Sequence, residues 1–396
     1  MAHVVMTWEL GGGLGHLMRL RPLANQLRQR GHHVTVIAKN VERAAYAFER
    51  HDVEILQAPP RSPRQNQLIT RPSTFPHLLH NTILDNRDND IARVLSWRDR
   101  YKQLKPDLLV FDHSPTAMLA ARDWPARRAV VGSGFFCVPD CDPFPDWRPW
   151  AGNDPKRLRR DQELVLDALN DISSTIGTPA LDRIGQLYAE VDDTLLLTFR
   201  ELDHYGAREN TTYWGQWPDA VGIYPDWPAG NGKRIFAYLK SGPALPVILQ
   251  SLATQGVSAI VYSPDADSRL MNAYRGTSVR LVDQPLNLVE VARTTDAAIL
   301  NGTHGTVTTM LLAGKPTLLI PLQLEQQLLT QAVVTLGAAV GAGQDDGPAL
   351  NRLCSALIED CGLQNAAEDF ANRYASFNAN RLREELVDRI ERLLPS

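Results

Sequence analysis

Asn301-Gly-Thr-His-Gly-Thr306 lies between a short apolar run, residues 297–300, and a segment of helical length, residues 306–313, that ends at Gly314. The apolar run is typical of a buried strand, and glycine is common just beyond the end of a helix. A strand, a glycine-rich turn and a helix in this order direct backbone N–H groups and the positive end of the helix dipole into the turn. The stretch therefore predicts an anion site that favours a phosphate, with the Thr303 and Thr306 hydroxyls as further donors.

Length and composition are those of an ordinary globular protein. The chain has 396 residues, of which 44% are hydrophobic and 22% charged. This length predicts roughly two or three domains. The formal net charge of -4 gives no general attraction to nucleic acid or to an anionic membrane, so we expect no nucleic-acid partner.

The first residues and the cysteines bear on the compartment. Residues 1–10 lack a basic region and lead directly into a glycine turn, which favours a first strand over a signal peptide. No run approaches the roughly 18 apolar residues that a membrane span needs. The four cysteines are few for the length and lack the spacing of a zinc site. We therefore expect a cytoplasmic protein without disulfides and without a bound metal.

Strand and helix patterns alternate along the chain, which predicts an α/β fold with parallel sheets. In the first half, the predicted strands cover residues 3–8, 33–38, 53–56 and 104–112. In the second half, they cover residues 234–239, 258–262, 278–282, 297–300 and 317–320. Residues 213–232 are rich in Pro, Gly and Trp, which indicates a linker between the halves.

Four segments, in order, resemble the GT-B glycosyltransferases, in the family that includes plant secondary-metabolite, animal glucuronosyl and bacterial antibiotic glycosyltransferases. Gly15-His16 is similar to that family's His-bearing loop, and Pro106-Asp-Leu with Asp112 matches its central acidic strand. Residues 279–283, Pro285-Leu286 and Asp296-Ala297 look like its nucleotide-base loop. Residues 301–326 align with its donor signature without a gap.

The resemblance implies two doubly wound Rossmann-like domains that face each other across a cleft. The implied limits are an acceptor-binding domain at 1–212, a linker at 213–232, a nucleotide-sugar-binding domain at 233–380 and a C-terminal helix at 381–396 that returns to the first domain. Two segments without periodicity, residues 59–76 and 135–150, would shape the acceptor site.

The resemblance also implies that His16 is a general base and that Asp112 orients its ring. The chemistry suits the residues, because histidine titrates near neutrality and a carboxylate on its far nitrogen fixes the tautomer. On residue types alone, a structural interpretation has equal weight. In it, His16 caps a helix or lines the turn, and Asp112 is a hydrogen-bonded acid at the end of a strand.

Carried over residue by residue, the family's donor site implies a diphosphate contact at 302–306, a base loop at 284–286 and a pair, Glu325 and Gln326, that binds sugar hydroxyls. A carboxylate and an amide suit a polyol, although an acid in a first helical turn is also good capping chemistry. The full implied set of nucleotide-sugar-binding residues is Gly15, Ser241, Gln284, Pro285, Leu286, Asn301, Gly302, Thr303, His304, Gly305, Thr306, Thr309, Glu325 and Gln326.

Three positions depart from the family pattern. Asn301 stands where a phosphate-contacting histidine is usual, and His304 is a candidate to compensate for it. Thr303 replaces a glycine, which would be unfavourable if this residue needed a positive φ. Thr309 occupies the place of a ribose-binding glutamate, and its short hydroxyl would suit a 2′-deoxyribose donor such as a thymidine diphosphate sugar.

Motifs that would indicate other kinds of site are weaker than the glycosyltransferase pattern. Gly11-Gly-Gly-Leu-Gly15 has His16 where a dinucleotide fingerprint needs glycine, and Lys39-Asn40 ends the next strand where an acid should bind ribose. Aspartate pairs with D-x-D spacing at 88–90, 140–142 and 265–267 are typical of surface turns as well as of metal sites. The basic run 156–160 favours a solvated face, or, with Trp147 and Trp150, an acceptor or membrane-surface contact.

The sequence therefore predicts an inverting, metal-independent glycosyltransferase that needs no cofactor beyond its nucleotide sugar. The donor would be a uridine or thymidine diphosphate sugar, and the acceptor a hydroxyl of a small molecule or a lipid, with at most peripheral membrane contact. A nucleotide-sugar epimerase on the same fold and a catalytically silent binding or partner protein remain as alternatives.

Overall fold

The computed structural model describes residues 1–49, 53–61, 65–218, 221–230 and 232–395, and the chain divides into two compact units. Unit 1 comprises Met1–Thr198, Asn210–Trp214 and Arg381–Ser396. Unit 2 comprises Phe199–Glu209 and Gly215–Asn380.

These limits differ from the predicted boundaries. Phe199–Glu209 packs with unit 2 and not with the rest of residues 1–212. The predicted linker also belongs to unit 2 from Gly215 on, and Ile223 in it pairs with Leu286 as a parallel β-bridge. Its residues 219, 220 and 231, like residues 62–64 of the 59–76 segment, lie outside the described residues.

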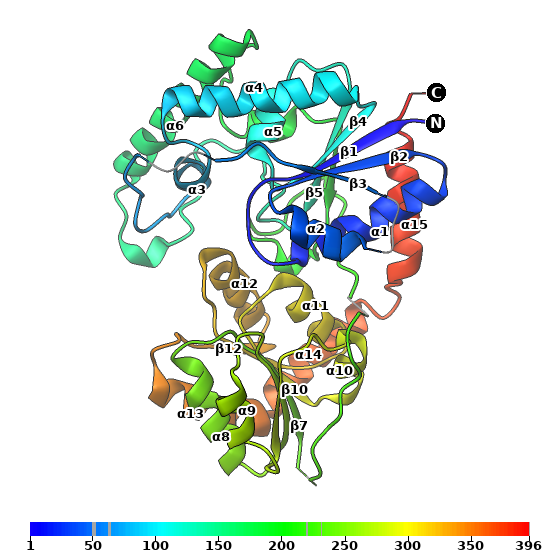
Figure 1. Cartoon of the computed structure of the whole chain (residues 1–396). Helices are drawn as coiled ribbons and strands as arrows, with labels where there is room; N and C mark the ends of the chain where they lie inside the picture. Colours follow the sequence, from blue (N-terminus) through cyan, green and yellow to red (C-terminus); the bar gives the residue numbers. More distant parts are fainter. Residues whose placement is uncertain (50–52, 62–64, 219–220, 231, 396) are drawn as a thin grey trace. The chain divides into compact units, whose positions relative to one another are not determined.

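Unit 1 is built on a six-stranded parallel sheet in the order β3-β2-β1-β4-β5-β6 (Figure 1). Its strands are β1 (His3–Trp8), β2 (His33–Ala38), β3 (Glu54–Gln57), β4 (Leu108–Asp112), β5 (Arg127–Gly132) and β6 (Asp193–Leu196). Strands β1 and β4 are almost fully buried because helices cover both faces, and they therefore read as apolar runs. Trp8 pairs in register with Asp112, so β1 and β4 end level with each other.

Helices cover both faces of this sheet. They are α1 (Gly15–Gln29), α2 (Val41–Phe48), α3 (Phe75–Thr82), α4 (Arg87–Leu104), α5 (Pro115–Ala120), α6 (Pro155–Ile176), α7 (Gln186–Ala189) and α15 (Ala379–Glu391). Helices α1 and α2 lie on one face, and α4 and α5 lie on the other (Figure 1). A stripe of four leucines fixes α1 to the sheet, namely Leu17, Leu20, Leu23 and Leu27, all fully buried.

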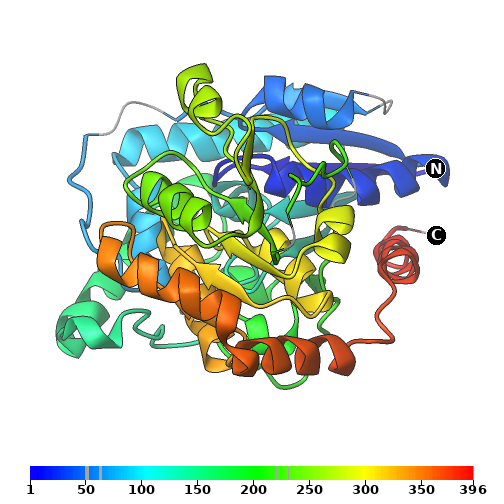
Figure 2. The same ribbon diagram turned by 90° about the horizontal axis from the view of Figure 1, so that it is seen from below.

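The C-terminal helix α15 packs with unit 1 from Arg381 on. Arg30, just beyond α1, forms ion pairs with Asp388 and Glu391 of α15. Arg389 of the same helix pairs with Asp193 of β6. Figure 2 shows α15 in red, viewed nearly along its axis.

Unit 2 repeats the topology of unit 1. Its parallel sheet has the order β12-β11-β10-β7-β8-β9, which is the unit 1 order when its strands are renumbered from β7. The strands are β7 (Arg234–Tyr238), β8 (Ser258–Tyr262), β9 (Val279–Val282), β10 (Ala297–Leu300), β11 (Thr317–Leu319) and β12 (Ala339–Gly341). Both sheets are therefore doubly wound in the Rossmann order.

Two hydrophobic cores lie on opposite faces of the unit 2 sheet, between the sheet and its helices. Ile235 and Ala237 of β7 pack with α8 (Ala244–Thr254) and α13 (Gly347–Glu359), whereas Phe236 faces the opposite core. That opposite core contains residues of α10 (Leu288–Thr294), α11 (His304–Leu312), α12 (Leu324–Thr335) and α14 (Cys361–Arg373). The remaining short helix is α9 (Ser268–Ala273). No helix of the described residues in either unit is long and apolar enough to span a membrane.

We expect the substitution Leu20→Ala to destabilise unit 1 by about 2–5 kcal/mol, because Leu20 is fully buried between α1 and the sheet and its loss leaves a cavity. Leu95→Ala on α4 is the control, since Leu95 is 43% exposed. Urea unfolding followed by circular dichroism measures both. Equal losses for the two variants would contradict the assigned packing of α1.

Candidate active site

Each sheet contains one topological switch point, where the crossover helices leave neighbouring strands toward opposite faces. In unit 1 it lies between β1 and β4, and in unit 2 between β7 and β10. Ligands of doubly wound sheets bind beyond the carboxyl ends of the strands at this position. The residues that follow β1, β4, β7 and β10 are therefore the candidates for a site.

At the unit 1 switch point, His16 and Asp112 form a buried hydrogen-bonded pair. His16 lies in the first turn of α1 and Asp112 is the last residue of β4. The His16 Nδ1 atom is 2.8 Å from Asp112 Oδ1, and the two residues are 6% and 0% exposed. An ionised carboxylate can only accept, so Nδ1 carries a proton, and in the neutral ring Nε2 then has the lone pair. The structure thus brings together the two residues of the predicted pair.

Asp112 is held in its ionised form by its neighbours. Burial opposes ionisation, but the adjacent His16 and Arg19 outweigh it and hold the pKa of Asp112 below its usual range. Arg19 Nη1 donates to both carboxylate oxygens of Asp112 at 3.1 Å. The His16 ring therefore contacts a fixed negative charge.

Gly11 leaves space for the far nitrogen of His16. Its φ is +84°, and a Cβ added to it would lie 2.4 Å from His16 Nε2. The backbone O of Gly11 accepts a hydrogen bond from Lys39 Nζ at 2.7 Å. Lys39 thus holds the backbone of the glycine turn. It follows β2, where a dinucleotide-binding protein would have an acid that binds the ribose.

His113, which sequence analysis missed, packs directly against His16. The two ring centroids are 5.8 Å apart, and Phe136 lies 4.5 Å from His113 and 4.8 Å from His16. Burial and the neighbouring His16 lower the pKa of His113 to about 3, so His113 is neutral at pH 7. His113 also has a φ of +48°, which is unusual outside glycine.

Two sequence features could have identified these additional residues. Arg19 is three residues after His16 on a helix, and this spacing places both side chains on one face. His113 directly follows an acid at a strand end. Glu9 has the corresponding position after β1, where its carboxylate accepts the N–H of Thr116 at 3.0 Å. The carboxylate of Glu9 is therefore hydrogen-bonded to the first turn of α5.

At the unit 2 switch point, the glycine-rich turn has the predicted backbone. Gly302 has a φ of +84°, and Thr303 is the N-cap of α11 with φ −65°. Thr303 therefore needs no positive φ, and its replacement of a glycine causes no strain. The side chain of Thr303 is exposed at the start of α11, whose first N–H groups have no partner within the helix.

Asn301 has a bracing role that sequence analysis did not anticipate. Its Oδ1 accepts the N–H of Lys240 at 2.8 Å, and its Nδ2 donates to the O of Ile320 at 2.9 Å. Lys240 and Ile320 lie beyond the ends of β7 and β11, so the amide ties three neighbouring strand ends together. A phosphate contact by Asn301 stays a prediction.

Other hydroxyls and amides of the predicted donor set also bind the backbone. Thr309 Oγ1 donates to the O of Gly305 at 2.8 Å, and the N–H of Leu322 donates to Gln326 Oε1 at 2.8 Å. Thr306 is buried in the first turn of α11. A ribose contact by Thr309 would need its hydroxyl oxygen as acceptor.

Glu325, His204 and His304 form a cluster beside this turn. His204 Nε2 is 3.5 Å from Glu325 Oε1, and the His204 and His304 rings stack with centroids 6.0 Å apart. Gln216 is also close, because a Cβ on Gly305 would lie 3.8 Å from its Nε2. His204 and Gln216 were missed, since they come from segments far from α11 in sequence.

The remaining predicted residues lie at several places. Ser241 follows β7, and its Oγ donates to the O of Asp265. In the predicted base loop, Gln284 and Pro285 are exposed and Leu286 is buried. The N–H of Ile223 donates to Pro285 O at 2.9 Å, so the predicted linker holds the backbone of this loop. Gly15 lies at the start of α1 and belongs to unit 1, whereas the other residues of the set belong to unit 2.

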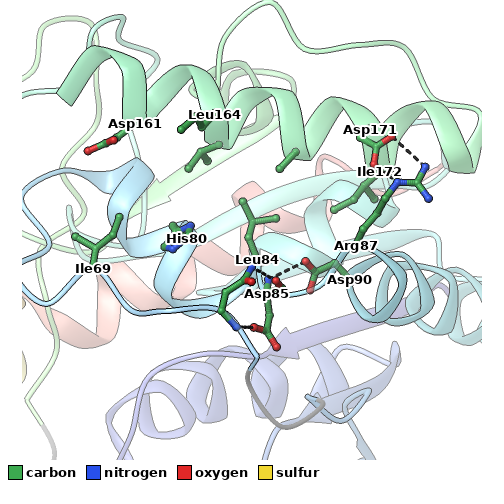
Figure 3. Close-up of a pocket in the computed structure, with 13 residues that line it drawn as sticks. Ile69, His80, Leu84, Asp85, Arg87, Asp90, Asp161, Leu164, Asp171 and Ile172 are labelled. Carbon is green, nitrogen blue, oxygen red and sulfur yellow. Dashed lines mark hydrogen bonds and ion pairs between the residues drawn. The ribbon is translucent and has the colours of Figure 1, made fainter. Parts of the chain in front are cut away.

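A separate pocket of about 370 Å³ lies between α3, α4 and α6 of unit 1 (Figure 3). Ile69, Leu84, Leu164 and Ile172 form much of its apolar wall, and neither His16 nor Asp112 lines it. Its charged side chains are already paired within the protein. Arg87 pairs with Asp171, and Asp85 accepts the N–H groups of Gln65 and Asn66.

Several of the D-x-D aspartates are likewise paired within the protein. Asp140 pairs with Arg183, Asp142 accepts from Gln162, and Asp90 accepts from Arg93. Within the described part of the chain, no group of three or more His, Cys, Asp or Glu side chains is arranged to hold a metal ion.

Replacing His113 by Asn should make the protein less sensitive to acid. A histidine with a pKa of about 3 in the fold and 6.5 when unfolded contributes stability above pH 6.5 that is lost as the pH falls toward 3. At pH 5 this loss is about 2 kcal/mol, and Asn removes it while tolerating a positive φ. Urea unfolding at pH 7 and pH 5 measures the change, and an equal fall in both proteins would contradict it.

Comparison with known proteins shows the fold. No family model matches the sequence, and no curated protein matches it significantly. Solved structures do match over the whole chain. The glycosyltransferase of kitacinnamycin has a TM-score of 0.74 at 17% identity, covering 100% of this chain and 99% of that one.

Two further matches were solved with a nucleotide. The glycosyltransferase VinC in complex with dTDP has a TM-score of 0.67 at 17% identity, covering 99% of each chain. The spinosyn rhamnosyltransferase SpnG complexed with thymidine diphosphate has a TM-score of 0.67 at 16% identity, covering 99% of this chain and 100% of that one. The chain thus has the two-unit Rossmann-like fold of the GT-B glycosyltransferases.

Proposed function

We propose that this protein is an inverting glycosyltransferase that moves a sugar from a nucleotide diphosphate donor to a hydroxyl acceptor without a metal ion. The observation that carries the proposal is the buried contact of 2.8 Å between His16 Nδ1 and Asp112 Oδ1 at the unit 1 switch point. The shared fold of named glycosyltransferases supports it.

The pair suits a general base. Because Asp112 keeps the proton on Nδ1, the Nε2 lone pair accepts the proton of the acceptor hydroxyl. The acceptor oxygen then forms a bond to the anomeric carbon while the bond to the diphosphate oxygen breaks. A single displacement of this kind inverts the configuration at that carbon. The proton ends on His16, where Asp112 stabilises the imidazolium.

The turn at 302–306 suits the diphosphate. N–H groups at the start of α11 and the positive end of its dipole stabilise the negative charge that develops on the leaving group. Thr303 adds an exposed hydroxyl, and Glu325 is an acceptor for sugar hydroxyls. These groups supply, from the protein itself, the charge stabilisation that metal-dependent transferases obtain from a cation.

The donor we favour is a thymidine or uridine diphosphate sugar. Two structurally similar proteins, VinC and SpnG, were solved with thymidine diphosphate. Thr309, buried and bonded to Gly305 O, offers less to a ribose 2′-hydroxyl than a carboxylate would. This favours thymidine over uridine. The acceptor is a hydroxyl of a small molecule or of a lipid carrier.

His16→Ala should lower transfer by about 10²–10⁴-fold without weakening nucleotide binding, because the base acts only in the chemical step. Transfer is measured as nucleotide diphosphate release from thymidine and uridine diphosphate glucose over a panel of hydroxyl acceptors, with EDTA present. His33→Ala is the control, since His33 is an exposed residue at the opposite end of the same sheet. Full transfer by His16→Ala would remove the base assignment.

Thymidine diphosphate or uridine diphosphate should stabilise the protein against heat with EDTA present, whereas NAD should not. A ligand at about 100 times its Kd adds about 2.7 kcal/mol. Gly302→Ala should lose this stabilisation, because its φ is +84° and a Cβ would meet Gln326 Cβ at 3.3 Å. The control Gly256→Ala has a similar φ of +67° with nothing within 4 Å.

The outcomes separate the alternatives. Stabilisation by nucleotide with no transfer to any acceptor would favour a silent binding protein. Release of an altered nucleotide sugar in the absence of acceptor would indicate an epimerase. No stabilisation by either diphosphate would contradict the donor site itself.

A further inference from the structure

Asp112 does not serve His16 alone. Its Oδ1 is 2.8 Å from His16 Nδ1, and Arg19 Nη1 lies 3.1 Å from both of its oxygens. All three side chains are buried, at 7% exposure or less. One carboxylate is therefore shared between an imidazole and a guanidinium that project from the same helix.

We propose that Arg19 is a positioning residue that shares Asp112 with His16 and offsets the charge of the carboxylate, which weakens the attraction of Asp112 for a proton on the His16 ring. The inference rests on the proposed function, because it assigns to Arg19 the control of the base in that reaction. It adds a third member to the predicted pair.

The geometry restricts the ways in which Arg19 can act. Its position three residues after His16 fixes both side chains on one face of α1. Its guanidinium carbon lies 5.6 Å from the centroid of the Phe136 ring, which also contacts His16. The Nε atom of Arg19 is buried with no hydrogen-bond partner among the described residues. Burial of a cation at this position is costly, so packing alone gives it no advantage over an apolar side chain.

The charges around His16 decide the direction of the effect. Asp112 at the end of β4 favours the imidazolium, and Arg19 on α1 opposes it. His113, beside Asp112, stays neutral because burial lowers its pKa to about 3. Lys39 beyond β2 is a second cation, held on the backbone of Gly11. Without Arg19, no neighbouring guanidinium would offset the attraction of the Asp112 carboxylate for the imidazolium form of His16.

Loss of Arg19 should therefore make His16 a stronger base that is protonated at higher pH. A His16 ring that already carries a proton on both nitrogens cannot accept one from the acceptor hydroxyl. The acid limb of the pH profile of kcat/KM should move to higher pH by the same amount as the titration of the ring.

The experiment is an NMR titration of the full chain with labelled histidine, in which the His16 signal is assigned by its absence in His16→Ala. In Arg19→Gln, we expect the titration midpoint of His16 to rise by about one pH unit or more relative to the native protein. Arg19→Lys restores the charge, so its midpoint should lie near the native one. Arg28→Gln is the control, because it removes a charge from the last turn of the same helix.

A midpoint in Arg19→Gln that is unchanged or lower would overturn the proposal. If that variant does not fold, Arg19→Met replaces it, since an unbranched apolar chain keeps the packing against Phe136. The titration needs no turnover, so it is independent of the transfer assay. A raised midpoint in a protein that transfers no sugar would count against the proposed function, whereas active protein with an unmoved midpoint would count against the role of Arg19.

Discussion

The order of strands in each sheet is the constraint on which the rest of the structure depends. In both units the chain winds outward from a central strand, returns to it and winds outward on the other side. The loops after β1 and β4, and after β7 and β10, are thereby separated by helices that leave toward opposite faces. His16 with Asp112, and Asn301 with the turn at 302–306, lie at these two positions.

In the proposed reaction, the same topology serves two different roles because the residues at the strand ends differ. In unit 1, carboxylates follow or end both central strands, as Glu9 and Asp112, and each has a buried arginine beside it, Arg93 and Arg19 respectively. In unit 2, Asn301 satisfies the strand ends with a neutral amide, which leaves the start of α11 without a carboxylate from β7 or β10. A proton acceptor suits the first position, and a diphosphate suits the second.

Local patterns in the sequence were sufficient for much of the fold, whereas the pairing of His16 with Asp112 was predicted from the family resemblance. Strands such as β1, β2, β8 and β10 are apolar runs followed by glycine or polar residues, and their limits were predicted to within a residue. Strands β5, β6 and β12 were missed, because β5 begins with Arg127-Arg128, β6 is half exposed at its start and β12 has only three residues. The contacts of Asn301 depend on partners 61 and 19 residues away, which no local pattern encodes.

The central claim is that the two switch points divide the reaction, with the base in unit 1 and the diphosphate in unit 2. A crystal structure with thymidine diphosphate and no divalent metal tests it most directly. We expect phosphate oxygens within hydrogen-bond distance of backbone N–H groups between Gly302 and Thr306. A diphosphate bound instead at the turn from Gly11 to Gly15, beside His16, would contradict it.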